Sequence, residues 1–271
     1  RGLPCPVIGV GDTVDDTLLD GIDVVVGTAQ DAASIVANIE AEPLAAMTLV
    51  QLLRHNERAT PQQGLLAESL AYASLQGRPS PRPGIGTAPD PGEPLRVERR
   101  TEELHITLNR PAARNAYSAR MRDALYDALL LLQADASLRR AVIRGEGSCF
   151  SIGGDLEEFG LAPDPATAHA IRSTRSVAGL LLELRDRLEF RLHRACIGAG
   201  IELPAFATRV LADRNTFVQL PEVGMGLLPG AGGTVSILHR IGRHHTAYLA
   251  LSGRRVNAAT ARGWGLIDGY L

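Results

Sequence analysis

The sequence contains no lysine, so every basic side chain other than histidine is an arginine. This absence excludes a lysine Schiff base, a pyridoxal-phosphate site and a P-loop lysine. Any phosphate on a ligand must therefore be bound by arginine, histidine or backbone N–H groups. Aromatic residues make up only 4% of the chain, and the formal net charge is −2. This composition argues against a nucleic-acid-binding surface.

Long hydrophobic runs are also missing, because no stretch reaches the roughly 18 apolar residues of a membrane-spanning helix. The first residues, RGLPCPVIGV, lack the order of charged, apolar and small residues that marks a signal peptide. The cysteines are Cys5, Cys149 and Cys196, an odd number without the spacing of a metal site. We therefore expect a cytoplasmic protein with no membrane association, whose thiols are reduced and buried.

The chain has 271 residues, of which 45% are hydrophobic, enough for one large domain or two modest ones. Residues 78–94, RPSPRPGIGTAPDPGEP, are dominated by proline and glycine and predict a linker without regular structure. This stretch is the natural domain boundary. It separates a small α/β segment, residues 1–77, from a larger unit, residues 95–271.

Within residues 1–77, short β-branched runs predict two strands and helical spacing predicts the helices that follow. Asp31 is the expected N-cap of the first long helix, and Pro43 should break it. In residues 95–271, strand and helix patterns alternate as in βαβ units, which favours an α/β fold. The expected elements are a hairpin at 96–99 and 104–108, a helix from Ser118 through Leu132, a strand at 141–143 and one long helix at 166–188.

The stretch from Cys196 to Thr234 contains the residues with the clearest chemistry. A short strand ending at Ile197 leads into the turn Gly198-Ala199-Gly200, and a helix is expected over 201–207. The free N–H groups of a helix start, with the positive end of the dipole behind them, suit a developing oxyanion. Glu202 lies in that first turn.

A second short strand, residues 216–220, ends at Pro221-Glu222. A carboxylate beside donors for a carbonyl oxygen is the arrangement needed to move a proton next to that carbonyl. Glu202 and Glu222 are therefore the candidate acid and base.

Four motifs in this chain occur in the order of one known family. They are LNRPAARNAYS at 108–118, GEGSCFSIGGDLEEF at 145–159, GIEL at 200–203 and LPEVGMGLLPGAGGT at 220–234. Over residues 104–271 the chain resembles the crotonase superfamily, the enoyl-CoA hydratases and isomerases. The resemblance implies a crotonase-like ββα spiral core.

The same resemblance implies roles for particular residues. Glu202 and Glu222 would be the catalytic carboxylates, and the backbone N–H groups of Ile152 and Ala199 the oxyanion hole for a thioester oxygen. The residues implied to bind the acyl-CoA substrate are Arg114, Gly153, Gly154, Asp155, Gly198, Gly200 and Gly230. No metal or other cofactor is implied, since CoA arrives as part of the substrate. The family also suggests a homo-oligomer, a trimer or hexamer.

The resulting hypothesis is reversible hydration of a 2-enoyl-CoA to a 3-hydroxyacyl-CoA, a reaction of the kind found in fatty acid metabolism. An enoyl-CoA isomerase or an acyl-CoA hydrolase on the same scaffold is an alternative, and so is a non-catalytic acyl-CoA-binding protein. Three departures favour the last: isoleucine at 152, Arg194 where relatives have glycine, and a chain that ends at Leu271 without the helical tail of the family.

Purely structural roles are also possible for several of these residues. The glycine-rich turns can simply let two chain segments pass closely. Glu202 can be an acid favoured by a helix dipole, and Asp155 a helix cap. His239, His244 and His245 lack the spacing of a zinc site and are expected to be solvated surface residues.

Overall fold

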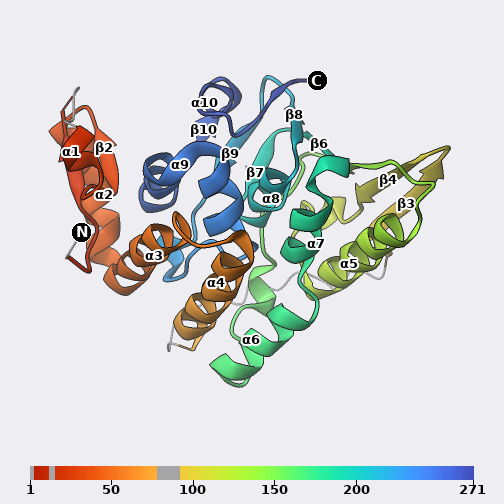
Figure 1. Ribbon diagram of the computed structural model, residues 1–271, viewed down its shortest axis with the longest axis horizontal. Helices are drawn as coiled ribbons and strands as arrows, with labels where there is room; N and C mark the ends of the chain where they lie inside the picture. Colours follow the sequence, from red (N-terminus) through yellow and green to blue (C-terminus); the bar gives the residue numbers. More distant parts are fainter. Residues whose placement is uncertain (1–2, 12–15, 78–91) are drawn as a thin grey trace.

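A computed structural model describes residues 3–11, 16–77 and 92–271 of the chain (Figure 1). Its largest sheet has six strands in the order β11-β8-β6-β5-β4-β3. Strands β3 and β4 form the predicted antiparallel hairpin, and the other neighbours in the sheet run parallel. The six strands are β3 (Leu95–Arg100), β4 (Glu103–Leu108), β5 (Arg140–Gly145), β6 (Leu188–Leu192), β8 (Arg209–Ala212) and β11 (Gly269–Tyr270).

Two smaller sheets accompany it. Strands β7 (Ala195–Ile197), β9 (Phe217–Gln219) and β10 (Val256–Asn257) form a three-stranded sheet in the order β10-β9-β7. Near the N-terminus, β1 (Ile8–Val10) and β2 (Val24–Val26) pair in parallel. Because β7 and β9 are parallel neighbours, the turns that follow them lie at one edge of this sheet. Glu202 and Glu222 both come after those turns.

The helices of the N-terminal segment are α1 (Asp16–Leu19), α2 (Ala29–Ala41), α3 (Pro43–Asn56) and α4 (Pro61–Gln76). Those of the remaining chain are α5 (Ala119–Ala134), α6 (Pro165–Thr174), α7 (Val177–Leu184), α8 (Ala199–Glu202), α9 (Gly233–Ser252) and α10 (Ala258–Trp264). Serine caps α5 as predicted, with Ser118 Oγ accepting from the Met121 N–H at 3.2 Å. A proline starts α3 and another starts α4, where its missing N–H costs nothing.

The N-terminal segment packs directly on the rest of the protein. Helices α3 and α4 contact α9, and α4 also contacts α6, so α4 lies beside elements far away in sequence (Figure 1). A buried ion-pair cluster supports this packing: Asp23 accepts from Arg54 at 2.8 Å and from Arg243 of α9 at 3.1 Å. Removing one partner of such a buried pair typically costs about 3–5 kcal/mol. Residues 78–91 of the predicted linker lie outside the described residues, and the domain division stays a prediction.

Some local predictions were wrong. Asp31 is not a cap, because Thr28 takes that position and its Oγ1 accepts from the Asp31 N–H at 3.1 Å. The long helix expected at 166–188 is two helices, α6 and α7, since Arg175 has non-helical backbone angles and Ser176 caps α7. Serine and threonine compete with the helical ladder in this way.

The helix expected over 201–207 also differs. It begins earlier, at Ala199, and gives way after Glu202 to a 3₁₀ turn, Pro204–Phe206. Pro204 has no N–H to donate to the α-helical ladder, which accounts for the change.

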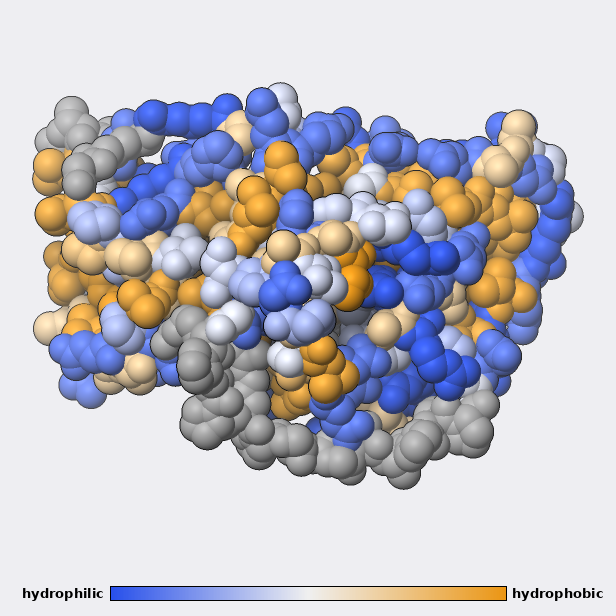
Figure 2. Space-filling view, turned by 90° about the horizontal axis from the view of Figure 1, so that it is seen from below, coloured by the Kyte–Doolittle hydropathy of each residue, from blue (hydrophilic) through white to orange (hydrophobic). Residues whose placement is uncertain are grey.

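Apolar residues occur both along the helices and on the molecular surface. In the described chain no single helix is long and apolar enough to span a bilayer; α2 and α3 meet the length and composition test only together, across a bend of 109°. Figure 2 shows apolar surface at the left-hand end, where the N-terminal segment lies in Figure 1. Exposed large apolar residues of this segment are Leu3, Val10, Leu18, Val36, Leu44, Leu66 and Leu70. The predicted homo-oligomer remains untested.

Candidate active site

The two loops predicted to form the oxyanion hole do lie side by side. Ser151 forms a parallel bridge with Cys196, and the Ile197 N–H donates to the Ser151 carbonyl at 3.0 Å. Gly153 and Gly198 meet so closely that a Cβ on Gly153 would lie 2.8 Å from the Ile197 carbonyl oxygen. Both glycines also have positive φ angles, 91° and 51°. Glycine at both positions therefore allows the two loops to approach each other this closely.

The two predicted oxyanion donors differ in their surroundings. Ala199 is the first residue of α8, where N–H groups have no partner within the helix, and it lines the main cavity. The Ile152 N–H instead donates to the carbonyl of Arg114 at 3.3 Å, and Ile152 does not line that cavity. The structure thus brings the two loops together, but the Ile152 N–H already donates to a carbonyl of the protein.

Glu202 is buried at the end of α8, with 2% of its surface exposed. Its Oε2 accepts two backbone hydrogen bonds, from the N–H of Ala231 at 2.7 Å and of Gly233 at 2.9 Å. Burial raises the pKa of Glu202 well above its usual value, the carboxyls of Glu222 and Glu68 raise it further, and the two N–H donors oppose them. These donors belong to the start of α9, whose dipole favours a negative charge.

Glu222 has a different environment, although it opens on the same cavity. Its Oε2 is buried and accepts no hydrogen bond from the described residues. Burial raises the pKa of Glu222 to about 8. Its Oε1 lies against Gly198, so closely that a Cβ at that position would collide with it. Glycine at 198 is therefore needed for both the positive φ angle and the place of the carboxylate.

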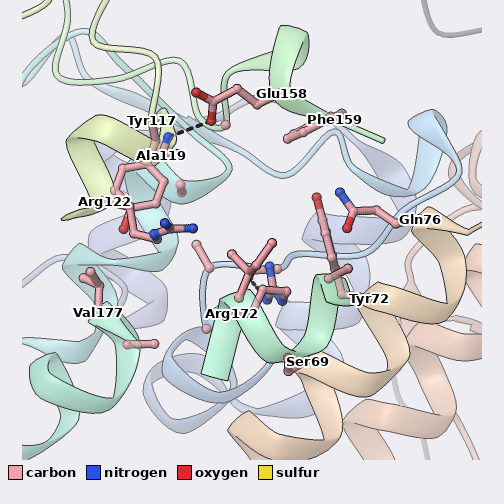
Figure 3. A pocket seen from close by; sticks show the side chains of 18 of the residues that line it. Ser69, Tyr72, Gln76, Tyr117, Ala119, Arg122, Glu158, Phe159, Arg172 and Val177 are labelled. Atoms are coloured by element: carbon pink, nitrogen blue, oxygen red, sulfur yellow. Dashed lines mark hydrogen bonds between the residues drawn. The ribbon is translucent and has the colours of Figure 1, made fainter. Parts of the chain in front are cut away.

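The cavity that contains both glutamates has a volume of about 490 Å³. Gly154, Asp155 and Gly230, which are predicted to bind substrate, also line it, and so does Ala199, a predicted oxyanion donor. Ile152, Gly153, Gly198, Gly200 and Arg114 are not in its lining. Figure 3 shows the side chains of Tyr72, Arg122 and Arg172 around the hollow, carried by α4, α5 and α6.

Helix α4 supplies a wall of this cavity that the sequence analysis missed. Glu68, Ser69, Tyr72 and Gln76 all line it, and all belong to the segment in which no chemistry was recognised. Glu68 is 2% exposed and binds the start of α9. The only available signal was a glutamate on the apolar face of a predicted helix, which on its own predicts little.

Asp155 and Arg114 have structural contacts. Asp155 caps a 3₁₀ turn, accepting from the Glu157 N–H at 3.4 Å, and pairs with buried Arg110 at 3.0 Å. Arg114 is exposed, has a left-handed backbone with φ of 50°, and offers its carbonyl to Ile152. Arg194 is also left-handed, with φ of 53°, a conformation that favours glycine.

The cysteines and histidines partly follow expectation. Cys149 and Cys196 are buried, whereas Cys5 is exposed, so its predicted burial was wrong. His239 and His245 are exposed, but His244 is half-buried, with Nε2 3.1 Å from the carbonyls of Leu19 and Ile22. Packing of the N-terminal segment against α9 covers it. Among the described residues, no cluster of three or more His, Cys, Asp or Glu could hold a metal.

A crotonase-type fold in which two glutamates follow adjacent glycine turns and line one cavity defines a class of acyl-CoA enzymes. The sequence model of the enoyl-CoA hydratase/isomerase family matches residues 99–271, and the chain belongs to this family. It is 33% identical over 175 residues to the 2,3-dehydroadipyl-CoA hydratase of Escherichia coli, covering 64% of this chain and 68% of that protein. It is also 33% identical to the carnitinyl-CoA dehydratase of Salmonella arizonae, covering 65% and 67%.

Solved structures agree on the fold. An enoyl-CoA hydratase from Thermoplasma volcanium superposes with a TM-score of 0.61 at 31% identity, covering 66% of this chain and 72% of that one. For other relatives the chain spans less than two thirds of their length, as with a Bacillus subtilis enoyl-CoA hydratase/isomerase, of which 64% is covered at 32% identity. The matched region is thus the core, and it leaves out the N-terminal segment that lines the cavity.

Proposed function

We propose that this protein hydrates a 2-enoyl-CoA thioester reversibly to a 3-hydroxyacyl-CoA. The observation that supports the proposal best is a pair of glutamates, Glu202 buried and Glu222 half-buried, that share one cavity but differ in hydrogen bonding. Two carboxyl groups in different environments can divide the roles of acid and base. No cofactor beyond the CoA of the substrate is part of the proposal.

In the proposed reaction Glu202 is the base. Burial and the neighbouring carboxyls raise the pKa of Glu202, and the two N–H groups at the start of α9 that donate to its Oε2 oppose this by stabilising the ionised form that a base requires. It takes a proton from water as the water oxygen bonds to Cβ of the substrate. The electron pair of the double bond moves toward the thioester, whose oxygen becomes negative. The N–H group of Ala199, which lines the cavity, would hold that oxygen.

Glu222 is the acid. Burial raises its pKa to about 8 and outweighs the hydrogen bond from its own backbone, so it retains its proton at neutral pH. It delivers that proton to Cα and completes the addition of water. Glu202 then releases its proton to solvent and Glu222 takes one up, which restores the starting state of both carboxyl groups. Because both carboxyls line one cavity, water and proton would reach the double bond from the same side.

The pH dependence tests the role of Glu222. Its pKa lies above the ordinary value, at about 8, so the carboxyl is protonated below that pH and loses the proton above it. A proton donor is needed for hydration, so kcat/KM should fall as the pH rises through 8. The measurement is kcat/KM across about pH 6 to 10, since this ratio reports the free enzyme. A flat profile through this range contradicts the assignment.

Turnover tests the proposal as a whole. A panel of enoyl-CoA thioesters of different chain length is incubated with the protein, and loss of the conjugated double bond is followed by absorbance. Consumption of at least one member with formation of the 3-hydroxyacyl product supports the hydratase. No consumption across the panel rejects it.

Glu202→Gln separates a hydratase from an isomerase. Hydration needs a base for water, so the variant should lose about a hundredfold to ten-thousandfold in kcat. Moving a double bond within the acyl chain can run on Glu222 alone and should be spared. The two activities are compared on a 2-enoyl-CoA and a 3-enoyl-CoA. Equal loss of both would contradict this division of roles.

One observation favours the second candidate, an acyl-CoA-binding protein without catalysis. The Ile152 N–H is hydrogen-bonded to the Arg114 carbonyl, so one oxyanion donor is already engaged. Calorimetry with acetyl-CoA beside the turnover assay distinguishes the two candidates: binding without turnover favours the second.

A further inference from the structure

Glu68 of α4 accepts hydrogen bonds from the same short stretch of backbone that donates to Glu202. The N–H groups of residues 231–234 alternate between the two acids. Those of Ala231 and Gly233 donate to Glu202, and those of Gly232 and Thr234 donate to Glu68. We call these four N–H groups the amide row.

Both carboxylate oxygens of Glu68 accept hydrogen bonds from the amide row. Oε1 accepts from Gly232 at 2.8 Å, while Oε2 accepts from the Thr234 N–H at 3.0 Å and from its hydroxyl at 2.7 Å. The side chain is buried, with 2% exposed. A buried carboxylate with this many donors is fixed in place, and its removal would leave the donors unsatisfied.

Arg172 of α6 connects Glu68 to the residue just before the amide row. Its Nη2 lies 3.7 Å from Glu68 Oε1 and donates to the Gly230 carbonyl, just before the amide row. Its guanidinium also stacks on the Tyr72 ring, with 4.3 Å from Cζ to the ring centroid (Figure 3). Helices α4 and α6 and the start of α9 thus meet at Glu68.

We propose that Glu68 is a positioning residue of the active site: it fixes the amide row so that alternate N–H groups can orient the carboxylate of Glu202. This inference rests on the proposed function for its kinetic consequence. It also makes the N-terminal segment a part of the catalytic centre, because α4 contributes the residue that orders α9 there. Glu68 itself need not touch the substrate.

Glu68→Asp tests this role by keeping the charge and shortening the reach. The shorter side chain holds its carboxylate farther from the N–H groups of Gly232 and Thr234, so the amide row loosens. We expect kcat to fall by about tenfold to a hundredfold, the scale of a misplaced catalytic group, with KM little changed. Glu57→Asp is the matched control, because Glu57 also ties the N-terminal segment to α9, through Arg243 at 3.2 Å, but does not line the cavity.

A second readout does not depend on turnover. The carboxyl carbon of Glu202 is followed by NMR across pH in ¹³C-glutamate-labelled protein, with its signal assigned by Glu202→Gln. The N–H bonds from Ala231 and Gly233 lower the pKa of Glu202, so their loss in Glu68→Asp should raise it, while a carboxyl group remains at position 68. Glu57→Asp should leave it in place.

The outcomes separate the two proposals. A folded Glu68→Asp protein with unchanged kcat and an unchanged Glu202 titration overturns the positioning role, as does equal loss of kcat in both variants. If wild type hydrates nothing but the Glu202 titration still shifts, the proposed function fails and the positioning role stands. Should Glu68→Asp not fold, Thr234→Val removes the 2.7 Å hydroxyl bond to Glu68, together with the 3.1 Å bond that Asn56 donates to the same hydroxyl, and keeps the N–H bond of residue 234 to Glu68. It should shift both readouts in the same direction by less.

Discussion

Glu222→Gln should abolish hydration without unfolding the protein. Glutamine keeps the shape of the side chain but has no proton to deliver to the α-carbon. The loss in kcat should be about a hundredfold to ten-thousandfold, the usual contribution of general acid–base catalysis. Since Oε2 of Glu222 accepts no hydrogen bond from the described residues, the substitution breaks no bond to that atom. Stopped-flow absorbance with a short enoyl-CoA measures the effect.

Thermal unfolding and a distant control complete this test. Glu98→Gln replaces an exposed acid of β3, whose side chain is 57% exposed, and should leave both turnover and melting temperature unchanged. Turnover of Glu222→Gln near that of wild type would contradict the role of Glu222 as proton donor. A large drop in melting temperature would instead show that Glu222 has a structural role.

Ala199→Pro should cost about a hundredfold to a thousandfold in kcat, the effect of removing one oxyanion donor. Proline deletes the N–H at the first residue of α8, where the helix itself makes no use of it. The fixed φ of proline also suits a first helical position. Substrate binding should weaken less than kcat, because the charge on the thioester oxygen develops in the transition state.

Ala199→Gly is the matched control for this substitution, since it keeps the N–H and removes only a methyl group. It should retain most of the activity, while circular dichroism confirms that both variants are folded. Similar turnover of the proline and glycine variants would show that the Ala199 amide is not an oxyanion donor. That result would favour the acyl-CoA-binding alternative, together with the engaged Ile152 amide.

Local chemistry predicted much of the fold. The hairpin of β3 and β4, the Ser118 cap of α5 and the break at Pro43 were all correct, because each depends on neighbouring residues. The predicted helix at 166–188 failed because its apolar spacing continues through a serine that caps a new helix at 176. Periodicity records which side is buried, and it does not record where the backbone turns.

Each family motif is a short run of neighbouring residues, so the family and the two candidate glutamates could be predicted from the chain alone. How those groups are held depends on contacts between segments that are distant in sequence. The tertiary structure placed Glu68 beside Glu202 on alternating N–H groups, directed the Ile152 amide to Arg114, and made α4 a wall of the cavity. The physical reason is that a buried carboxylate takes its hydrogen bonds from whichever donors the packed fold brings near, and that choice leaves no local pattern.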